Sequence, residues 1–174
     1  ALGLAPPSPA EWRARVETLA PALESLRDAA HGFRLGLLAD FGTAPELCSP
    51  AFFFGFDPLA CFLDLGFEVH VIAALASSLE ARRAAMPAGW RERLHLHDLG
   101  ADADPLPHVR RLALNLVYCD AHTSLPVKRQ GAHPFSICDL EPGVAGAARG
   151  LRRLLCRARS SFYAEFGRHL GAGA

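Results

Sequence analysis

Short apolar runs recur through the middle of the chain and alternate with segments of helical periodicity. The three clearest runs end in polar or small residues and span residues 33–40, 67–74 and 112–120. Apolar runs of this length are typical of strands buried on both faces of a parallel sheet. An alternating segment at 94–99 and a further run at 134–140 predict two more strands. Strands that alternate with helices predict a Rossmann-like α/β domain of three layers with a mostly parallel sheet.

A helix is predicted before the first strand. The segment Ser8-Pro9-Ala10-Glu11 has the form of a capping box with proline at the first helical position. A stripe of apolar residues follows at intervals of three and four, which predicts a helix that ends near Gly32 and is kinked at Pro21. The members of this stripe are Trp12, Val16, Leu19, Leu23 and Leu26.

Further helices are predicted between the strands and at the end of the chain. Those between the strands begin at Asp57-Pro58, at Ser77 or Ser78, and at Asp104-Pro105. A second apolar stripe predicts one terminal helix with Leu151, Leu155, Ala158, Phe162 and Phe166 on one face. We therefore expect a loose arm over residues 1–8, a packing helix over 9–32, a Rossmann-like domain over 33–146 and an arginine-rich C-terminal helix over 147–174.

Charge cancels over the whole chain but is unevenly placed. Eighteen basic and eighteen acidic side chains balance in 174 residues, so no global field favours nucleic acid or an anionic membrane. From Ala145 onward there are six arginines, and Glu165 is the only acidic residue. This pattern favours an intramolecular or partner-docking helix over a nucleic-acid groove.

The five cysteines are widely spread and include no C-x-x-C pair. Neither a zinc ribbon nor a disulfide framework is therefore indicated, and we interpret the thiols as reduced and buried in a reducing compartment. No apolar run approaches the roughly eighteen residues that span a bilayer, so we expect a soluble protein. The chain begins with Ala1 and its only methionine is Met86. It either begins after processing or represents part of a longer product.

Several short segments follow one another in a distinctive order. Residues 33–41 end in Asp-Phe, Phe67-Glu68-Val69 opens the next strand, and His97-Asp98-Leu99 follows. Residues 116–123 end in Ala-His-Thr, and the series closes with residues 132–137 and Pro142-Gly143. This order resembles the N-terminal half of the catalytic region of the O-linked N-acetylglucosamine transferase family, in which glycine is usual at the place of Ala121.

The resemblance implies a glycosyltransferase half that contacts a UDP-sugar. The ligand-binding positions it implies are Asp40, Gly42, His122, Thr123, Lys128 and Arg129. The family has a histidine after the Asp-Phe turn, whereas this chain has Ala44, which offers no proton-transfer group. The second lobe, which supplies most nucleotide-sugar contacts in the family, is not expected after Gly146. The resemblance therefore implies inherited architecture more than retained chemistry.

Two local clusters could carry chemistry by themselves. Asp120 and His122 follow the third clear strand and are the catalytic candidates, although two ligands do not make a stable site for a hard divalent cation. A helix cap is the favoured interpretation of Asp120. His95 and His97 lie on one face of a short strand and could bind zinc, but a third ligand is unspecified. We therefore predict structural histidines there, no metal site and no cofactor.

The sequence as a whole predicts a non-catalytic scaffold or accessory subunit of a larger assembly. Other protein subunits are the expected partners, and nucleic acid is not. The expected interface is the terminal helix, where arginine and aromatic residues of the kind enriched at interface cores occur together. Its residues are Arg152, Arg153, Arg157, Phe162, Tyr163 and Phe166. Two alternatives remain open, namely a UDP-sugar-dependent transferase lobe completed by another chain or a missing segment, and a Rossmann-like domain that binds a small molecule.

Overall fold

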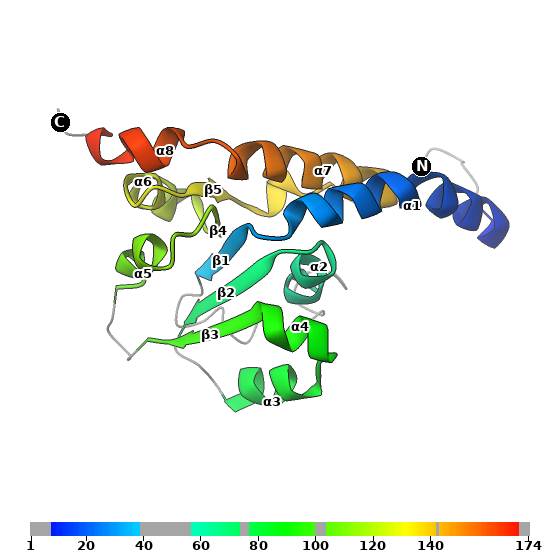
Figure 1. The fold of residues 1–174 in the computed structure, drawn as a ribbon, viewed down its shortest axis with the longest axis horizontal. Helices are drawn as coiled ribbons and strands as arrows, with labels where there is room; N and C mark the ends of the chain where they lie inside the picture. The colour runs from blue at the N-terminus through cyan, green and yellow to red at the C-terminus, as the bar shows by residue number, and fades with distance from the viewer. Residues whose placement is uncertain (1–7, 39–56, 74–76, 100–103, 142, 171–174) are drawn as a thin grey trace, which may run out of the picture.

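Five parallel strands form one sheet in the spatial order β3-β2-β1-β4-β5 (Figure 1). The computed structural model describes residues 8–38, 57–73, 77–99, 104–141 and 143–170. The strands are β1 (Arg34–Leu38), β2 (Glu68–Ala73), β3 (Leu94–Asp98), β4 (Leu116–Tyr118) and β5 (His133–Phe135). Every neighbouring pair runs parallel. The α/β class and the Rossmann-like three-layer arrangement predicted from the sequence are therefore confirmed.

Helices lie on both faces of this sheet. They are α1 (Pro9–Ala30), α2 (Pro58–Asp64), α3 (Ser77–Ala85), α4 (Ala88–Arg93), α5 (Leu106–Arg111), α6 (Ala121–Arg129), α7 (Gly143–Ala158) and α8 (Phe162–Phe166). Two short 3-10 helices, η2 (Ile137–Asp139) and η3 (Gly167–His169), follow β5 and α8. Across the described ranges, no helix combines the length and the apolar character needed to cross a bilayer.

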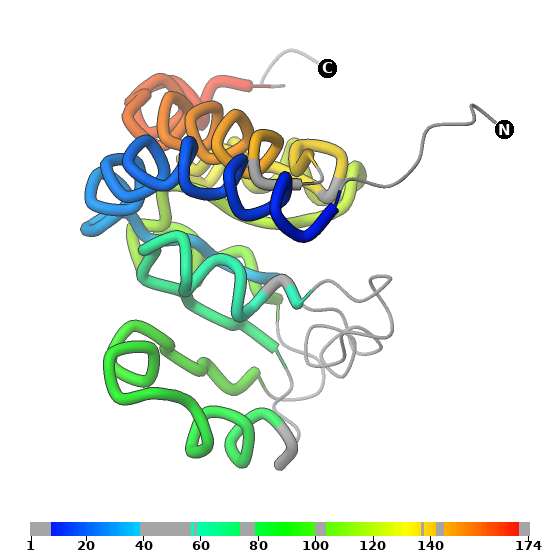
Figure 2. Tube along the Cα trace, turned by 90° about the vertical axis from the view of Figure 1, so that its right-hand side faces the viewer, coloured from blue at the N-terminus to red at the C-terminus, as the bar shows by residue number. Residues whose placement is uncertain are grey.

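Alternating side chains of the strands divide the interior into two cores. Leu37 of β1 and Val71 of β2 belong to the larger core, which includes residues of α1, α2, α3 and α7. Ile72 of β2 and Val117 of β4 belong to the smaller core, with Val109 of α5 and Val127 of α6. Since successive residues of a strand point to opposite faces, we call these the first and second faces of the sheet. Helices α1 and α7 run side by side over the first face (Figures 1 and 2).

Side-chain hydrogen bonds are present at several of the predicted helix starts. Ser8 and Glu11 form the capping box at the start of α1. Asp57 Oδ1 accepts from the amide of Ala60 at 3.0 Å and caps α2. Asp104 Oδ1 accepts from the amide of Leu106 at 2.9 Å, just before α5. The short polar side chains satisfy amide donors that a helix start leaves free.

Helix α1 spans Pro9–Ala30 and contains Pro21. It differs from its prediction in its apolar stripe, which is only partly buried. Trp12 is 45% and Val16 is 43% exposed, whereas Leu26 packs on the first-face core. The first half of α1 extends beyond the sheet (Figure 1), so no described element covers it.

The predicted single terminal helix is wrong, because α7 ends at Ala158 and α8 begins at Phe162. Between them the amide of Phe162 donates to the Ser160 hydroxyl at 3.4 Å, a local contact that competes with helix continuation. Leu151, Leu155 and Ala158 are buried as expected, but Phe162 and Phe166 are half-exposed.

The region around β4 also differs from the sequence prediction. The strand predicted from the apolar run at 112–120 is shortened to Leu116–Tyr118, because Ala113 adopts a positive φ of 49°. The following segment, which carries Lys128 and Arg129 and for which the sequence predicts no helix, is the helix α6. A proline within it, Pro126, masked this helix in the sequence.

Candidate functional site

The sheet has a topological switch point between β1 and β4. The chain moves from β1 to β2 and β3 on one side and then returns to place β4 and β5 on the other side. Ligands of open α/β sheets bind at the carboxyl ends of the two strands that flank such a point. Asp40 and Gly42, expected on the β1 side, lie outside the described residues, as does Ala44.

The β4 side of the switch point is the start of α6. Asp120 Oδ1 accepts from the amide of Thr123 at 2.7 Å and caps this helix. The same hydrogen bond holds the pKa of Asp120 below its ordinary value. His122 is exposed in the first turn of α6, and Thr123 is half-buried beside it. The carboxylate of Asp120 therefore has a structural role, while the His122 imidazole is accessible.

Cys119, just before this cap, is a buried thiol rather than an activated nucleophile. Burial raises its pKa to about 11, and the charge of Asp120 adds to the effect. Cysteine nucleophiles need a lowered pKa, because the thiolate is the reactive form.

The two basic residues of α6 lie at the end of the helix remote from His122. Six residues separate His122 from Lys128, a rise of about 9 Å along the helix axis. The Lys128 ammonium lies 5.6 Å from the centre of the Tyr163 ring. Arg129 Nε donates to the Leu170 carbonyl at 2.8 Å. The structure therefore separates His122 and Thr123 from Lys128 and Arg129.

A hollow of about 420 Å³ lies beside the edge strand β5, and some of the residues predicted to bind a ligand or a partner line it. Its lining includes Asp120, Lys128, Arg157 and Tyr163, but not His122. The positive groups are already engaged, because Arg157 pairs with Asp139 at 2.8 Å and Lys128 lies over Tyr163. Its described residues thus offer few free polar groups to a ligand.

The arginines predicted as an interface on α7 mostly make contacts within the chain. Arg149 and Arg153 each lie 2.7 Å from a carboxylate oxygen of Glu141, and these bonds lower the pKa of Glu141. Arg157 pairs with Asp139. Arg152 is exposed on α7. The charges of α7 therefore hold the segment that precedes it, as the intramolecular interpretation of this helix predicted.

A second, larger groove lies between α5, the end of α6 and α8. It encloses about 900 Å³ and is lined by four arginines, Arg110, Arg129, Arg159 and Arg168, which we call the arginine groove. Arg110 donates to the Arg129 carbonyl at 3.1 Å, and Arg168 donates to His169. None of the ion pairs formed within the described ranges uses any of the four.

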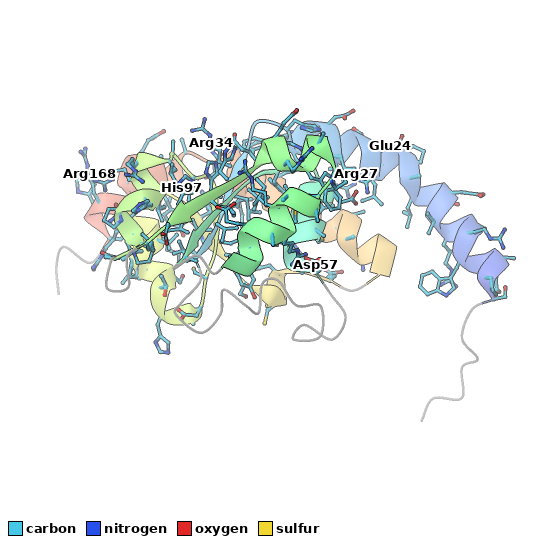
Figure 3. The ribbon with its side chains drawn as sticks, turned by 90° about the horizontal axis from the view of Figure 1, so that it is seen from below. Glu24, Arg27, Arg34, Asp57, His97 and Arg168 are labelled. Atoms are coloured by element: carbon cyan, nitrogen blue, oxygen red, sulfur yellow. The ribbon has the colours of Figure 1, made fainter. Side chains whose placement is uncertain are left out.

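Aromatic side chains border this groove. Tyr163 and Phe166 line it, and the Phe166 ring lies 5.5 Å from that of Phe162. Phe162 and Phe166 are 51% and 52% exposed. Arg168 lies at the end of the molecule opposite the tip of α1 (Figure 3). Charge and exposed apolar area therefore occur together at this end.

Sequence reasoning identified Phe162, Tyr163 and Phe166 but missed Arg110. Arg110 belongs to α5, about fifty residues before α8, and nothing in the local pattern links the two helices. A search of protein families finds no match to this chain, and no curated protein matches it.

Proposed function

We propose that this chain is a non-catalytic accessory domain that docks on a partner protein through the arginine groove. The observation that carries the proposal is the convergence of Arg110, Arg129, Arg159 and Arg168 on one groove without a described carboxylate partner. Guanidinium groups in such a position are available for charge-assisted hydrogen bonds with another molecule.

The partner that fits this groove is an acidic protein segment with apolar side chains. Carboxylates of the segment would pair with the arginines, and its apolar side chains would cover Phe162 and Phe166. Arginine and aromatic residues are the types enriched at protein interfaces. A nucleic-acid backbone fits less well, because Glu165 lines the same groove and the chain carries no net charge.

Two groups at the carboxyl end of β4, Asp120 and Cys119, support the non-catalytic part of the proposal. Asp120 is engaged as a helix cap, and the pKa of Cys119 is raised. A general acid–base or nucleophilic role needs a group that is free and whose pKa is tuned toward the working pH.

The proposal is tested with charge-reversed variants of the full chain in its source cells. Arg159→Glu/Arg168→Glu changes two exposed groove residues, and Arg13→Glu/Arg91→Glu makes the same charge change at exposed sites outside the groove. A partner that co-purifies in defined stoichiometry should be lost at least about tenfold from the groove variant and retained by the control, since charged interface pairs contribute a few kcal/mol. A strictly monomeric wild-type chain, or equal retention by both variants, contradicts the proposal.

The strand order favours a second candidate, a small-molecule site at the β1/β4 switch point. Calorimetric titration with UDP and UDP-N-acetylglucosamine tests it together with the transferase-lobe alternative. Under the accessory-domain proposal no heat of binding is expected. Micromolar binding that is lost in His122→Ala would contradict the non-catalytic proposal and support a ligand site at the carboxyl edge.

A further inference from the structure

Polar side chains gather on the second face of the sheet, where β2 and β3 lie next to each other. Glu68 and His70 alternate on β2, and His95 and His97 alternate on β3. The parallel register pairs His70 with His95 and Ile72 with His97. Arg34 of β1 pairs with Glu68 on the other side. The register therefore brings three histidines and one carboxylate together from two strands.

The burial of His70 needs a physical reason. His70 is 5% exposed and is the buried polar side chain in a set of core residues that is otherwise apolar. A central strand of a parallel sheet normally carries apolar residues on both faces. A buried polar group without a hydrogen bond costs free energy. His70 Nε2 is such a group, because it is buried and makes no hydrogen bond to any described residue.

The atoms around His70 Nε2 have the spacing of metal ligands. Glu68 Oε1 lies 3.3 Å from His70 Nε2 and 3.2 Å from His95 Nε2. All three atoms lie within 4.8 Å of one another. Two ligand atoms on a tetrahedral zinc ion, each about 2.0–2.1 Å from the metal, are about 3.3 Å apart. Two of the three separations already have this value.

Glu68 Oε1 lies 3.3 Å from His70 Nε2, yet the two atoms form no hydrogen bond. Two ligands of one metal ion lie beside each other in this way, without a hydrogen bond between them. The rings of His70 and His95 are stacked with their centres 4.7 Å apart. A tilt of the half-buried His95 ring, on the edge strand, would bring the two nitrogens together.

Neighbouring groups hold the ligands in the required orientation. His70 Nδ1 lies 2.9 Å from His97 Nε2, so a proton on Nδ1 leaves Nε2 free to bind. Arg34 Nε donates to Glu68 Oε2 at 3.3 Å, which turns Oε1 toward the histidines. Arg34 and His97, both labelled in Figure 3, are thus outer partners of the cluster.

We propose that Glu68, His70 and His95 form a binding site for one divalent transition-metal ion such as Zn²⁺, with a fourth position that these three residues leave open. Imidazole ligands select such ions over Mg²⁺ and Ca²⁺, which prefer oxygen. Two histidines, one carboxylate and an open position are a ligand set used by zinc proteins. The site lies on the sheet face and shares no residue with the arginine groove, so its test is independent of the proposed function.

The test is a titration of the untagged full chain, freed of metal by a chelator, with Zn²⁺ against a chromophoric competitor. We expect one equivalent to bind, and Co²⁺ in its place to give the visible absorption of a four-coordinate site. Glu68→Gln and His95→Ala should each weaken binding at least about tenfold, and His97→Ala should weaken it about 10–100-fold through its hydrogen bond. His122→Ala, which removes an exposed histidine of α6, is the matched control and should bind normally.

His95 is half-buried on an edge strand, so His95→Ala leaves the folded chain available for measurement. Zn²⁺ should raise the melting temperature of the wild type and of His122→Ala, but not of His95→Ala. A background of Cys138→Ser/Cys156→Ser removes the exposed thiols as competing ligands. The absence of a Zn²⁺ equivalent in the wild type, or binding unchanged by Glu68→Gln and His95→Ala, overturns the proposal.

Discussion

Gly66 lies in the turn between α2 and β2, where its φ is +97° and the backbone passes close to the end of α1. A Cβ at this position would lie 2.6 Å from the carbonyl oxygen of Arg27. Gly66→Ala should therefore lower the free energy of unfolding by roughly 2–4 kcal/mol, since left-handed strain of about 1–2 kcal/mol adds to a backbone clash. Urea unfolding followed by circular dichroism measures the change.

Gly32 supplies the matched control for that substitution. Its φ is +90°, yet a Cβ there would meet no atom within 4 Å. Gly32→Ala should cost only the strain of roughly 1–2 kcal/mol. Equal losses in the two variants would show that the approach of Gly66 to Arg27 contributes nothing.

Thiol reactivity also differs from residue to residue. Burial raises the pKa of Cys61 and of Cys119 to about 11, whereas Cys138 and Cys156 are exposed. At pH 8 we expect iodoacetamide to modify the two exposed thiols on the folded chain at least about 100-fold faster, because the thiolate is the attacking form. Peptide mass spectrometry resolves each site. Rapid modification of Cys119 in the folded chain would contradict its burial.

At the scale of single elements, the stability of helix α6 depends on the hydrogen bond between the Asp120 carboxylate and the Thr123 amide at its start. Asp120→Ala removes the carboxylate that accepts from Thr123 and should lower the free energy of unfolding by about 1 kcal/mol. Asp120→Asn keeps an acceptor and should cost much less. If both variants have wild-type stability, the cap does not hold the helix.

Elements with a clear local pattern were predictable. Strand β2 was expected from an apolar run at 67–74 and is Glu68–Ala73, and α2 begins where Asp57-Pro58 predicted. Helix α6 was missed because Pro126 and its mixed stripe weaken the helical pattern. The break before α8 was missed because the stripe of α7 continues through Phe162 and Phe166 in the sequence, although their side chains are half-exposed.

Sites built from distant elements could be predicted only in part from the sequence. The pairing of His95 with His97 followed from strand alternation, but the other two members of that cluster come from a strand about 27 residues earlier. Only the register of β2 against β3 brings His70 and Glu68 to them. Arg110 and Arg168 likewise meet through the packing of α5, α6 and α8. Local patterns specify elements, whereas these contacts depend on how the elements assemble.

At the scale of the whole molecule, one sheet supports both cores. Val71 belongs to the first-face core and its neighbour Ile72 to the second-face core. Neither core can open without disturbing strands that the other needs. We therefore expect one cooperative unfolding transition.

The two faces carry separate natural probes for this prediction. Trp90 packs on the first-face core and Cys119 lies in the second-face core. In a Trp12→Phe background, Trp90 fluorescence and the alkylation of Cys119 should give the same urea midpoint. Phe62→Ala empties a fully buried site of the first face and should lower stability by about 3–5 kcal/mol. Both probes should report the same loss of stability. If Phe62→Ala leaves the urea midpoint of Cys119 alkylation unchanged, the second face unfolds independently.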